Sequence, residues 1–393
     1  MRQITGCCGL ASKSRFSEYT SKSRFSEYKG VSKLSSHPHA APSPLGVGIL
    51  GSGPVTQAIH LPSLARLRDI LQVRHVMDVD PGVAESVAAR VGARHSTTVE
   101  ELLADPDVDI VAICSPHQFH ATQVIAACRA GKKAVLCEKP FAMNGEEAAA
   151  ISAVSAETGV PIVVGAMHTF DPGWLAAEAA WGDLPGQVHT VRSSIVLPPN
   201  PRFEDFATEI VGRVAAQSRG PLDEAALRAM ITGGVMGLAI HDLPLVRRFA
   251  PDFASVEVRH AQTVKPFGYL ISLRAGAVTI ELRAAMNSTW EPAWTFEAIG
   301  DDASLSIDFT PSYVQAGSAT ARIRRAGTTT VLGPFGHNGY EGEWRKLADI
   351  ARGTGKAPSA ETLLHDLEFA LAIAGAAADS AASKVPAPEE VLA

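Results

Sequence analysis

The alternation of apolar runs with helical stretches over residues 45–168 constrains the fold more than any other feature of this sequence. The runs have the length and composition of strands, and helical periodicity fills the segments between them. Continuous apolar strands joined by helical crossovers form a parallel sheet that is covered on both faces. We therefore predict an α/β domain with a doubly wound parallel sheet. The expected strands are 45–50, 71–78, 108–114, 133–140 and 161–168, and the expected helices are 54–67, 82–92 and 118–131.

From residue 169 onward the pattern changes. Segments of strand character follow one another with little helix between them, and several alternate apolar and polar residues like a sheet with one solvated face. We predict a Rossmann domain over 45–168 and a second α+β domain with a mainly antiparallel open sheet over 169–380. The expected strands of the second domain are 186–197, 254–264, 268–276, 277–286, 293–300 and 303–309, and helices over 223–249 and 360–382 bracket them.

The first 44 residues differ from the rest of the chain. They are rich in Ser, Lys and Arg and contain the repeat "SKSRFSEY" at 12–19 and 21–28. Such a segment buries little apolar surface, so we expect a disordered tail over 1–44 and a second short tail over 381–393. The tail carries a net charge of +5, which leaves −11 for the remainder of a chain whose total is −6. An acidic body of this kind is a poor partner for nucleic acid.

Other classes of protein are also disfavoured. No stretch approaches the roughly 18 consecutive apolar residues that a membrane helix needs. The five cysteines show no C-x-x-C spacing, which indicates reduced thiols, and we expect no metal site. We therefore expect a cytoplasmic protein that binds neither membrane nor nucleic acid.

The segment "GVGILGSGPVTQAIH" at 46–60 is typical of a loop that holds the pyrophosphate of a dinucleotide. Gly51 permits a tight turn, Gly53 allows the backbone to approach phosphate, and the helix that begins near Pro54 directs free N–H groups to the same place. Thr56 stands where a third glycine is usual. That glycine serves the packing of helix on strand, so its loss leaves the anion site intact.

Asp78 follows the second expected strand, 25 positions after Gly53. A carboxylate at this place accepts hydrogen bonds from the ribose hydroxyls and repels a 2′-phosphate. We therefore predict NAD as the coenzyme. NADP stays possible because Arg74 and His75 are close in sequence.

Five motifs resemble, in their order along residues 45–380, the family of glucose-fructose oxidoreductase, inositol dehydrogenase and MocA. They are the G-x-G loop, "HLP" at 60–62, "SPHQFH" at 115–120, "AGKKAVLCEKP" at 130–140 and "GGVMGLAIHDL" at 233–243. The resemblance implies a Rossmann domain followed by a domain whose open sheet lies over the nicotinamide. It also implies that Lys139, the lysine of the Glu-Lys-Pro motif, contacts the reacting hydroxyl.

The family also carries an Asp and a His four residues apart on a helix. Here the histidine is His241, and Gly237 occupies the place of the acid. His241 is the best candidate for a general base, because imidazole accepts a proton near neutral pH. Asp242 lies about 100 degrees around the helix and cannot simply replace the acid. Either Gly237 makes room for a bulky substrate, or an acid from residues 165–223 substitutes.

The resemblance thus implies hydride transfer between nicotinamide and a secondary alcohol or ketone of a sugar, inositol or related polyol. Two alternatives stay open: a non-redox enzyme that oxidises its substrate transiently, and an NAD-binding regulator without turnover. Relatives commonly pair through the C-terminal sheet, so we expect a homodimer or homotetramer. The coenzyme set is Gly51, Gly53, Pro54, Val55, Asp78, Ser115, Pro116, His120 and Glu138. The expected substrate contacts are Lys139, His168, Asp171, His241 and Asp242, with His168 equally open to a structural role and Asp171 to a turn.

Overall fold

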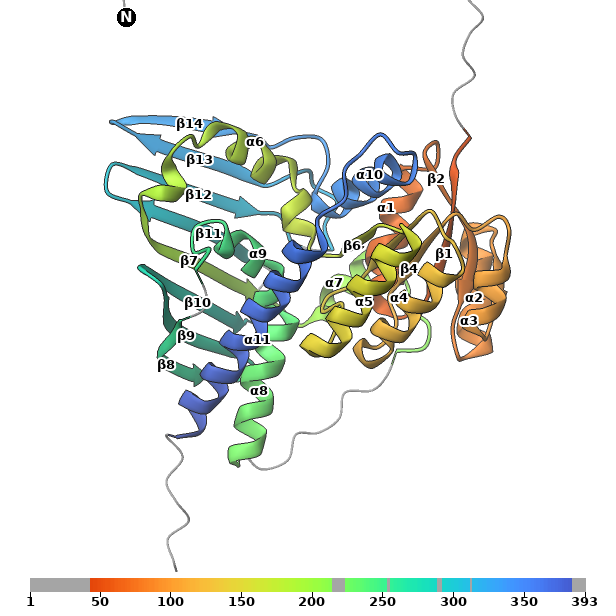
Figure 1. Ribbon diagram of the computed structural model, residues 1–393, viewed down its shortest axis with the longest axis horizontal. Coiled ribbons are helices and arrows are strands. Elements are labelled where there is room, and N and C mark those ends of the chain that lie inside the picture. The colour runs from red at the N-terminus through yellow and green to blue at the C-terminus, as the bar shows by residue number, and fades with distance from the viewer. Residues whose placement is uncertain (1–42, 214–222, 253–254, 288–291, 312, 384–393) are drawn as a thin grey trace, which may run out of the picture. The chain divides into compact units, whose positions relative to one another are not determined.

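Six strands form the first sheet of the computed structural model, in the order β3-β2-β1-β4-β5-β6 (Figure 1). Every neighbouring pair in it is parallel. The strands are β1 (Leu45–Leu50), β2 (Leu71–Met77), β3 (Arg94–Ser96), β4 (Ile110–Ile113), β5 (Ala134–Cys137) and β6 (Ile162–Val164). Strand order reverses between β1 and β4, and the carboxyl ends of strands beside such a reversal form the usual ligand crevice of this architecture. The predicted doubly wound sheet is confirmed.

The structure describes residues 43–213, 223–252, 255–287, 292–311 and 313–383. The predicted tails therefore lie almost wholly outside the described residues, as does the repeat at 12–28.

Helices cover the first sheet as its apolar strands require. They are α1 (Leu61–Arg66), which continues a helical turn over Thr56–His60, and α2 (Pro81–Val91), α3 (Val99–Ala104), α4 (His120–Arg129) and α5 (Gly145–Thr158). Local signals fix their ends. The side chain of Asp80 accepts hydrogen bonds from the first turn of α2, and Gly92 ends that helix at a φ of 65°.

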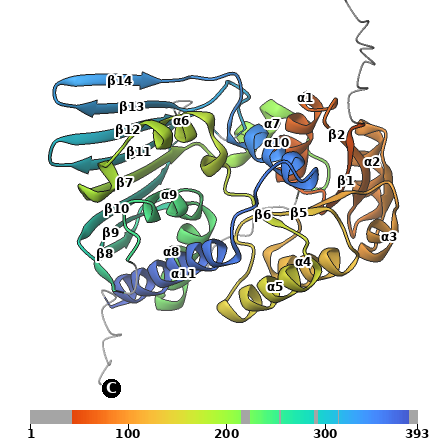
Figure 2. The same ribbon diagram turned by 45° about the horizontal axis from the view of Figure 1, so that its top comes forward.

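Eight strands form the second sheet, in the order β14-β13-β12-β11-β7-β10-β9-β8 (Figure 2). All neighbouring pairs are antiparallel except β7 with β10. The mainly antiparallel second sheet is thus confirmed, and the sequence reading missed β13 and β14. The strands are β7 (Val188–Leu197), β8 (Val256–Thr263), β9 (Gly268–Ala275), β10 (Val278–Met286), β11 (Ala293–Gly300), β12 (Ala303–Phe309), β13 (Thr320–Arg325) and β14 (Thr328–Leu332).

Helices pack their apolar residues against one face of this sheet in a shared core. They are α6 (Pro172–Ala180), α8 (Glu224–Gly237), α9 (Leu243–Arg247) and α11 (Ala360–Ala382). The long helix α11 lies beside α8 in both views (Figures 1 and 2). The remaining helices are α7 (Asn200–Ala207) and α10 (Gly339–Ala351).

Helix α10 belongs to the second half of the chain but packs on the first sheet. Trp344 and Leu347 share a buried cluster with Val47 and Ile110 of β1 and β4. The side chain of Trp344 is fully buried. The division of the chain at residue 168 stays a prediction, because α10 returns to the core of the first sheet.

The continuous helix expected over 223–249 is interrupted. Helix α8 ends at Gly237, a single 3₁₀ turn spans Ala239–His241, and α9 begins at Leu243. Residues 237 and 241 therefore do not lie one turn apart on a regular α-helix. Pro244, near the start of α9, has no N–H to continue an earlier helix, which accounts for the restart.

Candidate active site

The glycine-rich loop has the geometry that a pyrophosphate requires. Gly51 has a φ of +93°, and a Cβ there would lie 2.7 Å from the backbone nitrogen of Ser115. A Cβ on Gly53 would meet nothing within 4 Å, so the backbone is open to an approaching group. The helix begins at Pro54, and the Thr56 hydroxyl donates to the Gly51 carbonyl at 2.7 Å. Thr56 thus stabilises the turn from the position of the usual third glycine.

Asp78 is held beside this loop at the end of β2. Its carboxylate accepts hydrogen bonds from the backbone nitrogens of Ser52 at 2.8 Å and of Asp80 at 3.0 Å. Each oxygen keeps a further lone pair for a ribose hydroxyl. The loop and the acid therefore fit a dinucleotide together.

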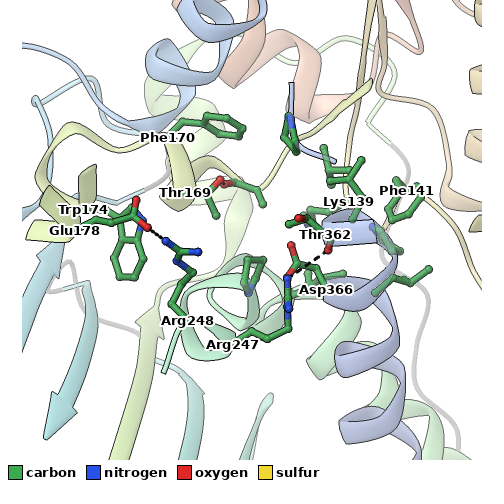
Figure 3. A pocket seen from close by; sticks show the side chains of 18 residues that line it. Lys139, Phe141, Thr169, Phe170, Trp174, Glu178, Arg247, Arg248, Thr362 and Asp366 are labelled. Carbon is green, nitrogen blue, oxygen red and sulfur yellow. Dashed lines mark hydrogen bonds and ion pairs between the residues drawn. The ribbon is translucent and has the colours of Figure 1, made fainter. Parts of the chain in front are cut away.

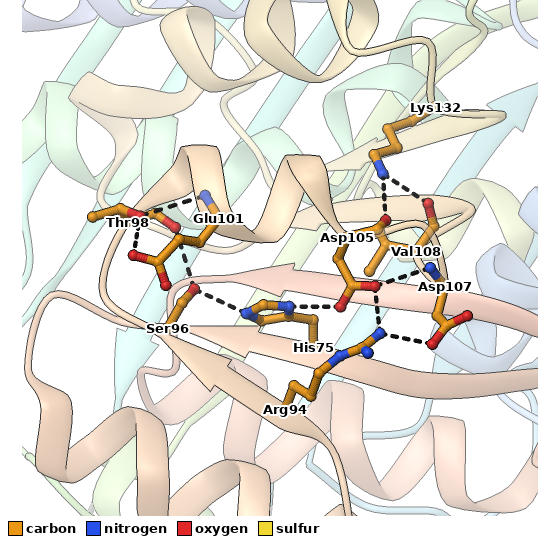
Figure 4. A network of polar contacts seen from close by, with 9 residues as sticks. All are labelled: His75, Arg94, Ser96, Thr98, Glu101, Asp105, Asp107, Val108 and Lys132. Carbon is orange, nitrogen blue, oxygen red and sulfur yellow. Dashed lines mark hydrogen bonds and ion pairs between the residues drawn. The ribbon is translucent and has the colours of Figure 1, made fainter.

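His75 is engaged elsewhere. Its Nδ1 lies 2.8 Å from a carboxylate oxygen of Asp105, and its Nε2 lies 2.9 Å from the Ser96 hydroxyl (Figure 4). Arg94 pairs with the same carboxylate, and the ammonium of Lys132 donates to the carbonyl of Asp105 at 3.1 Å. This network ties β2 and β3 to the segment before β4. His75 is therefore committed to structure and does not bear on the choice of coenzyme.

His120 links the Ser-Pro turn to the Glu-Lys-Pro motif. It is fully buried, with Nε2 2.8 Å from the Ser115 carbonyl and Nδ1 2.8 Å from the Pro140 carbonyl. Both ring nitrogens are occupied by backbone. His120 therefore links two backbone segments instead of presenting a free ring nitrogen to the coenzyme. Ser115 and Pro116 lie at the carboxyl end of β4.

Glu138 forms a buried pair that the sequence reading missed. Its carboxylate lies 3.0 Å from Nε2 of His60, whose Nδ1 accepts from the Trp344 indole at 3.2 Å. Burial alone would raise the pKa of Glu138, but the hydrogen bond that His60 donates, together with the positive charge of Lys139, outweighs it and lowers the pKa. Glu138 also accepts from the backbone nitrogen of Lys139 at 3.2 Å. The contact that the structure shows for Glu138 is therefore with Lys139, which it helps to position.

Lys139 directs its ammonium group toward the second half of the chain. Nζ donates to the carbonyl oxygen of Gly237 at 3.0 Å. Burial lowers the pKa of Lys139, and the nearby Glu138 carboxylate opposes part of that shift. A lysine in such a place can polarise a hydroxyl or carry a proton. The structure thus brings the Glu-Lys-Pro motif to the end of α8.

His241 lies in the 3₁₀ turn that follows α8, and 7% of its surface is exposed. Among the described residues its Nδ1 has no hydrogen-bond partner. Burial, followed by the charges of Lys139 and His168, lowers its pKa well below the ordinary value. The imidazole is therefore neutral at pH 7 and able to accept a proton.

Asp242 pairs with His168 and not with His241. Its fully buried carboxylate lies 2.6 Å from Nδ1 of His168. The same carboxylate accepts from the Ser193 hydroxyl at 2.6 Å and from the Trp294 indole at 2.7 Å. With three donors around it, Asp242 has no free face for a substrate. We correct its expected role from substrate contact to partner of His168.

His168 lies beside His241, with ring centroids 6.4 Å apart. It is 3% exposed and stacks on Phe309 at a centroid distance of 3.7 Å. His168 thus lies inside the buried cluster, and its contact with substrate stays a prediction.

Asp171 caps helix α6. Its carboxylate accepts from the backbone nitrogens of Gly173 at 2.7 Å and Ala319 at 3.1 Å. Asp171 thus lies at the turn that begins α6, as one of the two expectations had it. Its carboxylate also links α6 to the segment before β13. Asp171 therefore does not supply the acid missing at Gly237.

Two cavities lie near this contact, one lined by Lys139 and the other by its hydrogen-bond partner Gly237. One of about 490 Å³ is lined by Lys139 and by residues of α6, α9 and α11 (Figure 3). Its charged walls are internally paired, Arg247 with Asp366 and Arg248 with Glu178. The other, of about 420 Å³, is lined by Gly237 and by the end of β7.

The long connection after β7 reaches the glycine-rich loop. The side-chain amide of Gln57 donates to the carbonyl of Val211 at 2.9 Å and accepts from its nitrogen at 3.0 Å. The same amide donates to the Ser52 carbonyl at 2.7 Å. Residues 208–213 thus pack against the helix that follows the loop.

Comparison with known proteins agrees with this geometry. Residues 45–166 match the sequence model of an oxidoreductase family described as having an NAD-binding Rossmann fold. Over these residues the chain is similar to the family of glucose-fructose oxidoreductase, inositol dehydrogenase and MocA. The match covers the first sheet with its glycine-rich loop and supports an NAD-binding Rossmann fold there.

Two curated relatives illustrate the spread of the family. Inositol 2-dehydrogenase 3 of Saccharopolyspora erythraea is 26% identical over 340 residues, which cover 85% of this chain and 92% of the relative. The 4-carboxy-2-hydroxymuconate-6-semialdehyde dehydrogenase of a Sphingobium species is 37% identical over 127 residues, but these cover 32% of this chain and 39% of that relative.

A solved structure shows the same two-sheet fold. UDP-N-acetylglucosamine 3-dehydrogenase from Acidithiobacillus ferrooxidans superposes with a TM-score of 0.66 at 21% identity, covering 86% of this chain and 98% of the other. The similarity in fold therefore extends over the second sheet. In the part of the chain that the structure describes, no helix is both long and apolar enough to cross a membrane.

Proposed function

We propose that this protein is a dehydrogenase that transfers hydride between NAD and a secondary alcohol of a sugar, inositol or related cyclic polyol. The observation that carries the proposal is the hydrogen bond of Lys139 to the end of α8, beside a buried His241 whose Nδ1 has no hydrogen-bond partner among the described residues. The family supplies the reaction class. The inositol dehydrogenase that aligns over most of its length supports the polyol substrate.

The chain's own residues would hold the coenzyme at the carboxyl ends of β1, β2 and β4. Gly51, Gly53 and Pro54 would hold the pyrophosphate, and Asp78 would accept hydrogen bonds from the adenosine ribose. Val55, Ser115 and Pro116 border the same crevice. When bound, the nicotinamide supplies a hydride acceptor, while the protein supplies position and proton transfer.

Two residues act on the reacting hydroxyl in this proposal. His241 removes its proton, because the depressed pKa keeps the imidazole neutral over most of the physiological range. Lys139 donates a hydrogen bond to the same oxygen and stabilises its negative charge as the proton leaves. In the reducing direction the two groups act in reverse on a ketone.

Second-sphere groups position this pair. Glu138 accepts from the backbone of Lys139 and is itself held by His60. The ring of His168 lies 6.4 Å from that of His241, and the buried carboxylate of Asp242 fixes the orientation of His168. A protein that only bound coenzyme would need neither arrangement, which favours an enzyme over a regulator.

Assembly is a further part of the proposal. Residues on the outward face of the second sheet are polar and paired, as in Arg192 with Glu281 at 2.6 Å. We expect copies of the chain to associate through this face into dimers or tetramers, and light scattering after size-exclusion chromatography measures the state directly.

The test is absorbance at 340 nm with NAD or NADP and a panel of inositols, sugars and amino sugars. We expect NADH formation that Lys139→Met and His241→Gln each reduce at least about a hundredfold. Lys133→Met and His189→Gln are matched controls on exposed side chains and keep wild-type rates. Coenzyme binding without turnover on any member would overturn the dehydrogenase and favour transient oxidation or regulation.

A further inference from the structure

The cavity of about 420 Å³ has an unusual lining for a polyol site. Among the described residues that line it, one side chain is polar, that of Asn200, and none is charged. The others are apolar side chains, prolines and glycines: Ile195, Leu197, Pro198, Pro199, Pro201, Gly233, Gly237, Leu238, Phe267, Ala285 and Met286. Hydroxyl groups buried here would lose water without gaining partners.

The cavity adjoins the proposed reaction site. Gly237 lines it, and the carbonyl of this same residue accepts from Nζ of Lys139 at 3.0 Å. On β7, Ile195 lies two residues after Ser193 and so shares its face of the sheet. Ser193 is the hydroxyl that donates to Asp242. The apolar cavity therefore shares Gly237 with the contact that Lys139 makes at the end of α8.

Two glycines of α8 keep this space open. Gly233 and Gly237 are one turn apart and face the same side. A Cβ on either would meet nothing within 4 Å, and neither has a φ in the left-handed region. Backbone conformation therefore does not require glycine at these positions, although glycine within a helix is less favourable than alanine.

Gly234 provides the contrast. A Cβ there would lie 2.7 Å from the ring of Tyr269, so packing explains this glycine. No such contact explains its neighbours at 233 and 237. Their missing side chains leave room on the cavity side, at the position where the family's acid is replaced.

We propose that the substrate is a cyclic secondary alcohol that carries an apolar substituent, such as an aryl aglycone, which occupies this cavity. The inference rests on the proposed function and deepens it. The polar ring presents its reacting hydroxyl to Lys139 and His241, and the hydrocarbon part lies between β7 and α8. Transfer of an apolar group from water into this cavity is favourable. Transfer of a second sugar ring is not, because its hydroxyl groups would lose their hydrogen bonds to water.

The experiment compares methyl and phenyl β-D-glucopyranoside as substrates, with NADH formation as the readout. We expect kcat/KM to be at least about tenfold higher for the phenyl compound. Gly233→Leu fills the cavity without touching Lys139 and brings the phenyl-to-methyl ratio close to one. Leu197→Asn, which makes the wall polar, also lowers the ratio. Gly375→Leu, an equivalent change in α11 at an open position, keeps the wild-type ratio.

The outcomes separate this inference from the proposed function. Equal kcat/KM for the two glucosides, with turnover that depends on Lys139, overturns the apolar substituent and leaves the dehydrogenase. If neither glucoside is oxidised, the affinity of each for the protein in the presence of NADH is measured by calorimetric titration. Tighter binding of the phenyl compound that Gly233→Leu abolishes supports the cavity assignment, and equal binding overturns it.

Discussion

The ammonium group of Lys139 donates a hydrogen bond of 3.0 Å to the main-chain carbonyl of Gly237. The similar family has an aspartate at the position of Gly237, whereas here the ammonium group contacts a neutral backbone carbonyl. Burial is the main cause of the low pKa of His241, and the positive charge of Lys139, which a neutral carbonyl does not cancel, lowers that pKa further. The consequence is a base that stays neutral in more acidic solution than an ordinary histidine.

The pH dependence of activity tests this relationship. A base with a lowered pKa keeps its proton-accepting form below pH 6.5, so the acid limb of kcat/KM should lie below that value. Gly237→Asp adds a negative charge near both groups, which favours imidazolium and moves the limb to higher pH. Gly237→Asn, the neutral isostere, should leave it in place. An acid limb that does not move in the aspartate variant contradicts the assignment of His241.

Coenzyme choice depends on Asp78. Asp78→Asn keeps the size of the side chain but removes the charge that repels a 2′-phosphate. We expect kcat/KM with NAD to fall about ten- to hundredfold, while the value with NADP rises relative to it. Asp69→Asn, at an exposed position before β2, is the matched control. An unchanged ratio of the two coenzymes would place the discrimination on another residue.

The buried pair of Asp242 and His168 should contribute strongly to stability. Asp242→Asn presents an amide to three donors and leaves His168 without its carboxylate. Breaking a buried pair in this way costs about 3 kcal/mol in the free energy of unfolding. Asp308→Asn, which breaks an exposed pair with Arg322, should cost below about 1 kcal/mol. Denaturant unfolding measures both, and equal losses would argue against a structural role for the buried pair.

Glu343 in α10 should make stability depend on pH. Its carboxyl group is fully buried and has no hydrogen-bond partner among the described residues, and burial raises its pKa well above the ordinary value. A raised folded-state pKa stabilises the fold below the unfolded pKa of 4.5, and that contribution is lost as the pH rises toward the folded value.

Glu343→Gln removes this titration. We expect the variant to be more stable than wild type at pH 8 by about 1–3 kcal/mol, with the difference shrinking toward pH 4. Glu361→Gln, an exposed acid at the start of α11, serves as control. A gain that is the same at both pH values would show that Glu343 is not protonated on folding.

Local patterns predicted most of the two sheets. Apolar runs located β1, β2, β4, β5 and β6, and the glycine-rich loop located the dinucleotide site, because these signals lie within a few residues of one another. The short edge strand β3 and the polar β14 carry too little apolar patterning to stand out.

Long-range pairing was beyond the sequence patterns. His60 and Glu138 are 78 positions apart, and His168 and Asp242 are 74 apart. Periodicity does not encode such contacts, so sequence patterns predict neither the pairing of Asp242 with His168 nor the backbone contacts of His120. The interruption after Gly237 was missed for a related reason. Packing of Ala239 and Leu243 into the second core outweighs the helical pattern there.

The joint action of Lys139 and His241 on one hydroxyl is the central claim, and a double-mutant cycle measures it most directly. kcat/KM for NAD reduction is determined for wild type, Lys139→Met, His241→Gln and the double variant with one polyol substrate. Residues that act as a unit are not additive, so the account predicts that the double variant loses little more than the more damaging single one. Losses that multiply across the two substitutions would show independent roles and contradict it.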